Sequence, residues 1–193
     1  MISNNIEHIV GLVGKKASGK DTFYLACLEL FAIDKKILIP PKRFAFADAL
    51  KLEVANKFDI SIGQLNKEKE KYRKDLQDTG EARRKEDNEY WIKQVAKKLL
   101  DFDLETFNKV HCPHLVIITD VRYINEAQWI KSLGGNLIRI RRTDIPDDME
   151  DKHSSEIELE SIACNYYLDN EGPNRYNLYK MQILDTLHQL KIS

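Results

Sequence analysis

The segment from Gly14 to Thr22 reads Gly-Lys-Lys-Ala-Ser-Gly-Lys-Asp-Thr and has the spacing of a loop that binds phosphate. Its two glycines let the backbone turn N–H groups toward an anion, and Lys20 can reach the outer phosphates of a nucleotide. A helix that begins here would direct its positive end at the same anion. A serine or threonine normally follows this lysine and binds Mg²⁺, but here Asp21 comes first and Thr22 next. The alternative is a glycine-rich connection without a ligand.

Charged residues also follow the other apolar runs that we interpret as strands. In an open parallel sheet the ligand binds outside the carboxyl ends of the strands, so residues at these ends should meet. The residues at these ends are Asp48 and Lys51, Asp120 and Arg122, and Arg141 and Arg142. Each has a simpler alternative: Asp120 could cap a helix, Arg122 could pair with Glu126 one turn later, and the other arginines could be surface charges.

Phosphoryl transfer would use this mixture of groups. Charge spreads over the oxygens of the transferred group, so the protein must supply positive charge, Mg²⁺ and alignment. Lys20 and the loop amides would hold the donor, and an arginine such as Arg122 would hold an acceptor phosphate by two parallel hydrogen bonds. Asp120 could hold Mg²⁺ directly or through water.

Apolar runs alternate with helix-period segments, which predicts one α/β domain with a mainly parallel sheet. We expect strands at about 7–13, 42–46, 115–119, 136–142 and 165–169, with the two most apolar, 7–13 and 115–119, adjacent and central. Helices are expected from near Lys20, after Phe46 with Leu50, Val54 and Phe58 facing inward, from 125 to 133, and at the C-terminus. A helical insertion at about 61–103 separates the second and third strands, and an acidic loop spans 144–152. The charged segment 67–74 is interpreted as a solvated face or loop.

Composition sets limits on the partners. The chain has 193 residues, 42% hydrophobic and 32% charged, with a net charge of −1, which is typical of a soluble globular protein and gives no overall affinity for nucleic acid. No apolar run has transmembrane length and the N-terminus lacks a signal-peptide core, so we expect no membrane partner and a cytoplasmic location, in the host if the protein is viral. Three cysteines form no disulfide framework. The cluster His111-Cys112-Pro113-His114 lacks a zinc spacing and is interpreted as a loop. A homodimer is left open.

Several motifs together resemble the bacteriophage-type deoxynucleoside monophosphate kinases, which belong to the adenylate-kinase-like P-loop kinases. The resemblance covers nearly the whole chain, and its most specific parts are the aspartate at position 21 and the Asp120-Val121-Arg122 strand end. The other motifs are Phe46 to Lys51, Leu76 to Arg84 with Tyr90-Trp91, Asn125-Glu126, His153 to Glu156 and Asn170 to Gly172. The resemblance implies a three-layer P-loop kinase fold with a five-stranded parallel sheet, helices on both faces and a short lid at about 143–153.

The family reaction transfers the γ-phosphate of ATP, with Mg²⁺, to a deoxynucleoside monophosphate, so the implied partners are small nucleotides. The implied ATP site comprises Gly14, Lys15, Ala17, Ser18, Gly19, Lys20, Asp21, Thr22, Arg139 and Arg141. The implied acceptor site comprises Asp21, Asp48, Lys51, Arg83, Arg84, Trp91, Asp120, Arg122 and Glu156. Lys20, Arg122 and Arg142 would be catalytic, and Asp21, Thr22 and Asp120 are the candidate Mg²⁺ ligands. Taken alone, Lys51, Arg83 and Arg84 could equally be solvent-exposed charges, and Trp91 could be a core residue.

Two other functions compete with this one. Animal-type phosphomevalonate kinase has a similar loop that also ends Ser-Gly-Lys-Asp, so the acceptor could be another small phosphorylated molecule. A nucleotide-binding regulator with little turnover would need a long partner surface or a basic extension, and neither is evident in the sequence.

Overall fold

Five strands form one parallel sheet in the order β2-β3-β1-β4-β5 in the computed structural model, which describes residues 6, 8–33, 40–107, 115–143, 154–172 and 174–192. The strands are β1 (His8–Val13), β2 (Lys42–Phe44), β3 (Leu115–Val121), β4 (Asn136–Arg141) and β5 (Tyr166–Asp169). All neighbouring pairs are parallel. β1 is the central strand and β3 lies beside it, so the expected adjacency of the two most apolar strands is confirmed.

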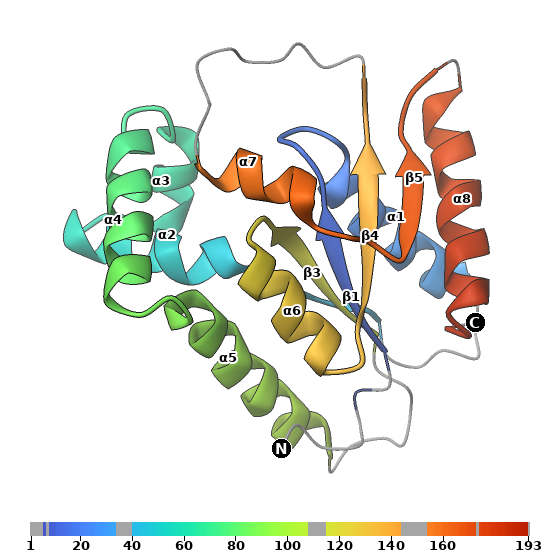
Figure 1. The fold of residues 1–193 in the computed structure, drawn as a ribbon, viewed down its shortest axis with the longest axis horizontal. Coiled ribbons are helices and arrows are strands. Elements are labelled where there is room, and N and C mark those ends of the chain that lie inside the picture. The colour runs from blue at the N-terminus through green and yellow to red at the C-terminus, as the bar shows by residue number, and fades with distance from the viewer. Residues whose placement is uncertain are drawn as a thin grey trace.

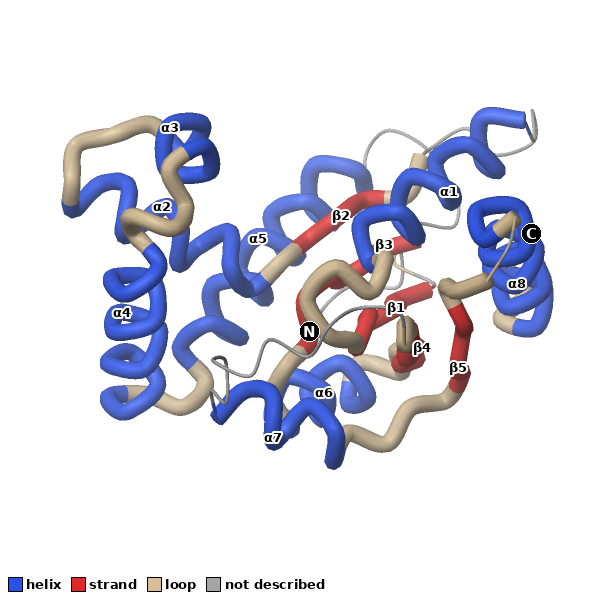
Figure 2. The backbone as a smooth tube through the Cα atoms, turned by 90° about the horizontal axis from the view of Figure 1, so that it is seen from above, coloured by secondary structure: helices blue, strands red, loops and turns tan. Residues whose placement is uncertain are grey.

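Helices cover both faces of this sheet and make it the middle layer of three (Figure 1). Within the described residues they are α1 (Lys20–Ile33), α2 (Phe46–Lys57), α3 (Ile62–Lys67), α4 (Arg73–Glu86), α5 (Tyr90–Phe107), α6 (Ile124–Ser132), α7 (Ser154–Ser161) and α8 (Arg175–Gln189). Figure 2 shows α1 and α8 on one side of the strands and α6 and α7 on the other. The expected fold class, a three-layer α/β fold with a five-stranded parallel sheet, is confirmed.

The alternation of side chains along β1 explains why both faces are covered. Val10 and Leu12 join an apolar cluster with α1 and α8, whereas Ile9 and Val13 join the cluster on the opposite face. Each of these four side chains is at most 6% exposed. A strand buried on both faces needs apolar residues at every position, which is why it appears as a continuous apolar run in the sequence.

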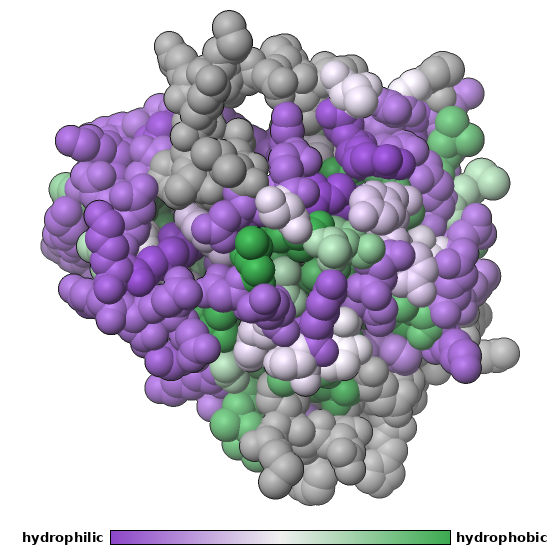
Figure 3. All heavy atoms as spheres, in the orientation of Figure 1, coloured by the Kyte–Doolittle hydropathy of each residue, from purple (hydrophilic) through white to green (hydrophobic). Residues whose placement is uncertain are grey.

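The insertion between β2 and β3 is helical, as expected, but it is longer and more ordered than the sequence indicated. It comprises α3, α4 and α5 and extends to Phe107. Val54, Leu65 and Tyr72 form a small separate core between α2 and the insertion. The surface over α4 is mainly hydrophilic in Figure 3. The part of the insertion around α3 therefore has a small core of its own, whereas α5 packs in the cluster that covers one face of the sheet.

Some sequence expectations are wrong in detail. β2 ends at Phe44, because Phe46 already begins α2. Phe58 does not face inward: it caps the C-terminus of α2, is 39% exposed and packs on the ring of Tyr72. The helix α7 was not expected.

Two expected features, the acidic lid segment 144–153 and the cluster at 111–114, lie outside the described residues. In the part of the chain that is described, no helix combines the length and apolar character needed to cross a membrane.

Candidate active site

The loop between β1 and α1 needs glycine at both of its motif positions. A Cβ on Gly14 would lie 2.6 Å from the carbonyl oxygen of Ile140 and 2.6 Å from the Ser18 hydroxyl. Gly19 has a φ of +109°, and a Cβ there would lie 2.1 Å from the side-chain nitrogen of Asn170. The close neighbours at both positions, and the left-handed backbone at Gly19, leave no room for a larger residue unless the surrounding atoms move.

Side chains from the end of the chain hold this loop in place. The Asn170 amide, just after β5, donates to the carbonyl oxygen of Ser18 at 2.8 Å and is 5% exposed. The Tyr179 hydroxyl on α8 donates to the carbonyl oxygen of Gly19 at 3.2 Å. Sequence reasoning gave no role to either residue. Their contacts fix the shape of the loop independently of any ligand.

Lys20 lies over the loop, and its charge is only partly compensated. Its ammonium donates to the carbonyl oxygens of Gly14 and Lys15, both at 2.6 Å. Burial, followed by the nearby guanidinium of Arg122, lowers the pKa of Lys20 from 10.5 to about 8. A negatively charged ligand at this position would reverse that shift, because it favours the protonated amine.

The three arginines predicted at the end of β4 take three different positions. Arg142 donates to the carbonyl oxygen of Ala17 at 3.1 Å and therefore lies beside the phosphate loop. Arg141 pairs with Asp169 at 2.9 Å on the neighbouring strand. Its role in ATP binding stays a prediction.

Arg139 lies on the face of β4 that α7 covers, where it is buried, and it does not line the cavity at the phosphate loop. Its guanidinium donates to the carbonyl oxygens of Leu159 and Ile162, both at 2.7 Å. These carbonyls lie at and just after the end of α7, so Arg139 stabilises the end of a helix. The sequence showed the alternation along the strand, but not that a helix would cover this face.

A cavity of about 390 Å³ begins at the phosphate loop and extends between α2, α4 and the end of β3. This volume is within the range of small-molecule sites. Its mouth carries a cation cluster, which we define as Lys16, Lys51, Lys69, Arg73 and Arg122. Its inner end is lined by Leu50, Leu76, Gln77, Gly80, Arg84, Trp91, Tyr123 and Glu126.

The cation cluster has little compensating negative charge. Arg73 pairs with Glu70 at 2.6 Å, whereas no carboxylate among the described residues lies within ion-pair distance of the other four members. Lys69 is exposed at the mouth of the cavity, yet partial desolvation and then the charges of the other four members lower its pKa. Side chains of like charge gathered in this way cost free energy unless an anion binds between them.

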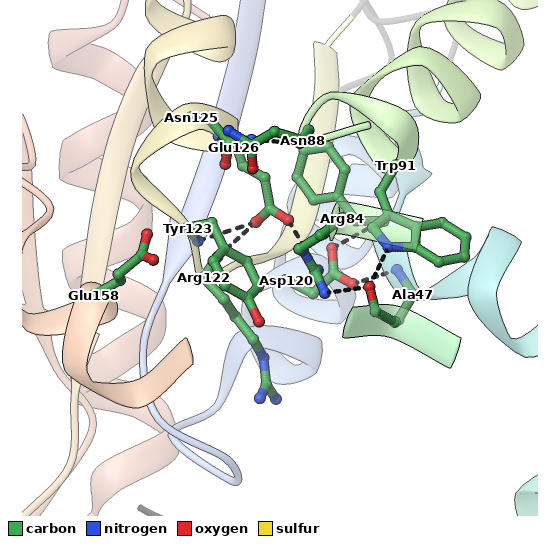
Figure 4. Close-up of polar contacts among 12 residues, drawn as sticks. Ala47, Arg84, Asn88, Trp91, Asp120, Arg122, Tyr123, Asn125, Glu126 and Glu158 are labelled. Carbon is green, nitrogen blue, oxygen red and sulfur yellow. Dashed lines mark hydrogen bonds and ion pairs between the residues drawn. The ribbon is translucent and has the colours of Figure 1, made fainter. Parts of the chain in front are cut away.

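Arg122 points into the site rather than toward Glu126. Its backbone N–H donates to the Glu126 carboxylate at 2.9 Å. Its guanidinium points away from that carboxylate (Figure 4) and forms no ion pair with any described residue. The helix pair considered as an alternative is therefore absent, and the Arg122 side chain is available to a ligand.

Asp120, near the end of β3, caps the N-terminus of α2. Its two carboxylate oxygens accept the backbone N–H groups of Phe46 and Ala47, both at 2.8 Å, at the start of α2. Burial raises the pKa of this carboxyl group. Each oxygen keeps a second lone pair, so the capping role does not exclude a metal ligand.

Arg84 is held at the inner end of the cavity by its neighbours (Figure 4). Its guanidinium lies 3.6 Å from Glu126, 3.2 Å from the carbonyl oxygen of Gly80 and over the ring of Tyr123. The Trp91 indole donates to the same carbonyl oxygen at 3.3 Å and is 2% exposed. Burial raises the pKa of Glu126 to about 7. Trp91 is thus both a core residue and part of the cavity wall.

The structure does not bring all predicted site residues into the cavity. Asp48 and Arg83 do not line the cavity. Asp48 pairs at 3.0 Å with Arg43, which does line it, and Arg83 pairs with Glu53 at 3.1 Å. Thr22 does not line the cavity, whereas Asp21 does. The side chain of Glu156 is outside the described part of the structure.

Sequence reasoning missed several cavity residues, above all Lys69, Arg73 and Gln77. They follow each other at intervals of four positions, and this spacing was the available signal. It was overlooked because the acidic residues between them suggested a solvated surface.

Comparison with known proteins identifies the family. Residues 12–136, more than half of the chain, match the family model described as phosphomevalonate kinase. A protein of Acanthamoeba polyphaga mimivirus named "Putative deoxynucleotide monophosphate kinase" is 31% identical over 170 residues, which cover 80% of this chain and 83% of that protein.

Two solved structures of shikimate kinases are distant neighbours. The enzyme from Aquifex aeolicus is 16% identical, with a TM-score of 0.40 over 96% of this chain and 99% of its own. The enzyme from Bacteroides thetaiotaomicron is 12% identical, with a TM-score of 0.38 over 95% and 98%.

The phosphate loop, the cavity beside it and the family match agree on the class of protein. The chain therefore belongs to a family of P-loop kinases, the one whose model is described as phosphomevalonate kinase, and it is a relative of the mimivirus protein.

Proposed function

We propose that this protein is a deoxynucleoside monophosphate kinase, which transfers the γ-phosphate of ATP to the phosphate of a deoxynucleoside 5′-monophosphate. The observation that carries this proposal is the cation cluster, which shares one cavity with Lys20. The name of the mimivirus relative supports the same acceptor. The bacteriophage type of the enzyme stays a prediction.

The two groups of cations match two phosphorylated substrates. The loop amides and Lys20 suit the donor phosphates, while the cation cluster suits an acceptor that already carries phosphate. An acceptor that offered only a hydroxyl group would leave the charges of Lys51, Lys69 and Arg122 opposed to each other without an anion. Desolvation and then the charges of its four neighbours lower the pKa of Lys69, and a bound phosphate would offset this crowding of positive charge.

Catalysis would rest on alignment and charge. The loop holds the donor at one end of the cavity, and Arg122 can hold the acceptor phosphate by its two-pronged guanidinium. Lys20 lies between these positions and can stabilise the charge that develops on the transferred group. The fixed loop supplies these groups without reorganisation, because Asn170 and Tyr179 already hold it.

The residues present fit Mg²⁺. Asp21 and Asp120 are carboxylates of the cavity lining beside Lys20. Mg²⁺ is typically held by one or two carboxylates, water and substrate phosphates, so two carboxylates are sufficient. When bound, the ion would neutralise phosphate charge. Thr22 is the less suitable candidate, because it does not line the cavity.

Phosphomevalonate is the second candidate acceptor, since the family model carries that description. This acceptor has a carboxylate at the end opposite its phosphate, and it would need a free cation at the inner end of the cavity. Arg84 is the cation there, and it is already paired with Glu126 and with the carbonyl oxygen of Gly80. The apolar wall of Leu50, Leu76 and Trp91 is better suited to a planar base.

The test is a panel of acceptors with ATP and Mg²⁺: the four common deoxynucleoside monophosphates, their ribonucleotide counterparts and phosphomevalonate. Diphosphate formation, resolved by ion-exchange chromatography, is expected for one or more deoxynucleotides. Phosphorylation of phosphomevalonate alone would favour the second candidate, and ATP hydrolysis independent of any acceptor would contradict both.

A matched pair of variants connects the result to the cavity. Lys69→Ala removes a member of the cation cluster and should raise the KM for the acceptor. Lys67→Ala removes an exposed lysine at the end of α3, outside the cavity, and should leave it unchanged.

A further inference from the structure

One face of α4 forms a wall of the cavity. Arg73, Gln77, Gly80 and Arg84 all line the cavity, and their spacing of four, three and four places them on the same face of the helix. At a rise of about 1.5 Å per residue, Gln77 lies about 6 Å along the helix axis from Arg73 and about 10 Å from Arg84. A ligand anchored by its phosphate at Arg73 would meet Gln77 next.

Among the described residues, Gln77 carries the one side-chain amide at the inner end of the cavity, and no protein group is bonded to it. Arg84 and Glu126 bind each other, and the Trp91 indole is bonded to the carbonyl oxygen of Gly80. The half-buried amide of Gln77 has no hydrogen-bond partner among the described residues. A partly buried amide gains free energy from a bound partner, and this one faces a cavity.

Gly80 keeps the wall beside Gln77 flat. Glycine is unfavourable in the middle of a helix, and its backbone here is helical, so conformation does not require it. A Cβ at this position would lie 3.3 Å from the guanidinium of Arg84 and 3.5 Å from the Leu50 side chain. The absence of a side chain lets Arg84 and Leu50 pack directly against α4, beside Gln77.

We propose that Gln77 is a specificity-determining residue, which binds the hydrogen-bonding edge of the acceptor base and sets the relative preference among bases. This inference rests on the proposed function. With the acceptor phosphate on the cation cluster, the base enters the inner end of the cavity, which Leu50, Leu76 and Trp91 line, and its edge faces the amide of Gln77. The amide both donates and accepts hydrogen bonds. A side chain that could only donate or only accept should therefore alter the order of preference among the bases.

The substitution Gln77→Glu tests this with little change in shape. The carboxylate only accepts hydrogen bonds, and guanine offers two adjacent donors on its Watson–Crick edge, whereas thymine offers one donor between two acceptors. The ratio of kcat/KM for dGMP to that for dTMP should therefore rise about tenfold or more in this variant. Gln77→Leu removes both functions and should lower the kcat/KM of the preferred nucleotide about tenfold.

The measurements are kcat and KM for dAMP, dGMP, dCMP and dTMP at saturating ATP, with KM for ATP and thermal unfolding as readouts of a structural effect. Asp78→Asn is the control, since Asp78 is the neighbouring, exposed residue of α4 and does not line the cavity. A changed order of preference with unchanged KM for ATP supports the inference.

Equal effects on all four nucleotides, or none, would overturn the inference while the proposed function stands. A wild-type protein that phosphorylates none of the four would overturn both.

Discussion

Replacement of Arg122 by glutamine should weaken acceptor binding without destabilising the fold. The guanidinium forms no ion pair with any described residue, and the backbone N–H that bonds Glu126 remains in the variant. The substitution therefore removes no protein contact that the structure shows. It also removes a charge that lowers the pKa of both Lys20 and Lys69. The free energy of unfolding should change by no more than about 0.5 kcal/mol, as for other substitutions without contacts.

The effect on the acceptor should be much larger. A hydrogen bond to a charged group contributes about 1.5–3 kcal/mol, and each 1.4 kcal/mol is a factor of about ten. Loss of the two-pronged contact should raise the KM for the monophosphate about 10- to 100-fold. Turnover should also fall, because the acceptor oxygen is no longer held in line with the donor phosphorus. The KM for ATP should change far less, since the donor is held by the loop.

Steady-state assays that measure ADP, with each substrate titrated in turn, provide the test. Arg122→Lys keeps the charge but loses the fork and should give an intermediate KM. Lys98→Gln removes an exposed positive charge on α5, outside the cavity, and serves as the control for net charge. A rise in KM that is larger for ATP than for the monophosphate would refute the assignment, as would a loss of stability of several kcal/mol.

Three further predictions follow from the site. The pKa of Lys20, about 8 against an ordinary 10.5, means that this lysine is mostly neutral near pH 9. Nucleotide binding at that pH should therefore take up a proton, which calorimetry in buffers of different ionisation enthalpy would measure, and Lys20→Met should show no uptake. The pKa of Glu126, about 7 against 4.5, means that the folded state holds this proton more tightly, so stability should fall as pH rises between these values, and Glu126→Gln should flatten that slope in urea unfolding. Gly19→Ala places a side chain at positive φ against Asn170 and should cost about 1–3 kcal/mol of stability and abolish nucleotide binding; normal binding would show that the loop can relax.

The elements that bind phosphate were predictable from sequence because they follow local rules. The glycine spacing around Lys20 has a steric cause within the loop, and β1 and β3 are apolar throughout because both faces are covered. Strand alternation likewise predicted that Arg139 and Arg141 share a face, but the destination of each side chain depends on α7 and β5, which are distant in sequence.

The acceptor side of the site was less predictable, because its side chains also depend on elements that are distant in sequence. Asp120 can be read as a metal ligand or as a cap, and the structure shows that the helix it caps begins 74 residues earlier, at Phe46. Lys69, in the turn before α4, and Gln77, on α4, line the site only because this part of the insertion faces the phosphate loop across the cavity. A helix with mixed charges gives no local sign of which side faces a site and which faces water.

The contacts of Asn170 and Tyr179 with the phosphate loop have a consequence for synthesis of the chain. The two side chains that hold the loop follow it in the sequence by more than 150 residues, so the loop leaves the ribosome well before them. β1 is likewise flanked by strands that are made later. A nascent chain that ends near residue 136, where the family match stops, would contain the whole nucleotide motif without its supports. Arrested nascent chains should therefore gain affinity for nucleotide only when α8 has emerged, in one late step rather than gradually.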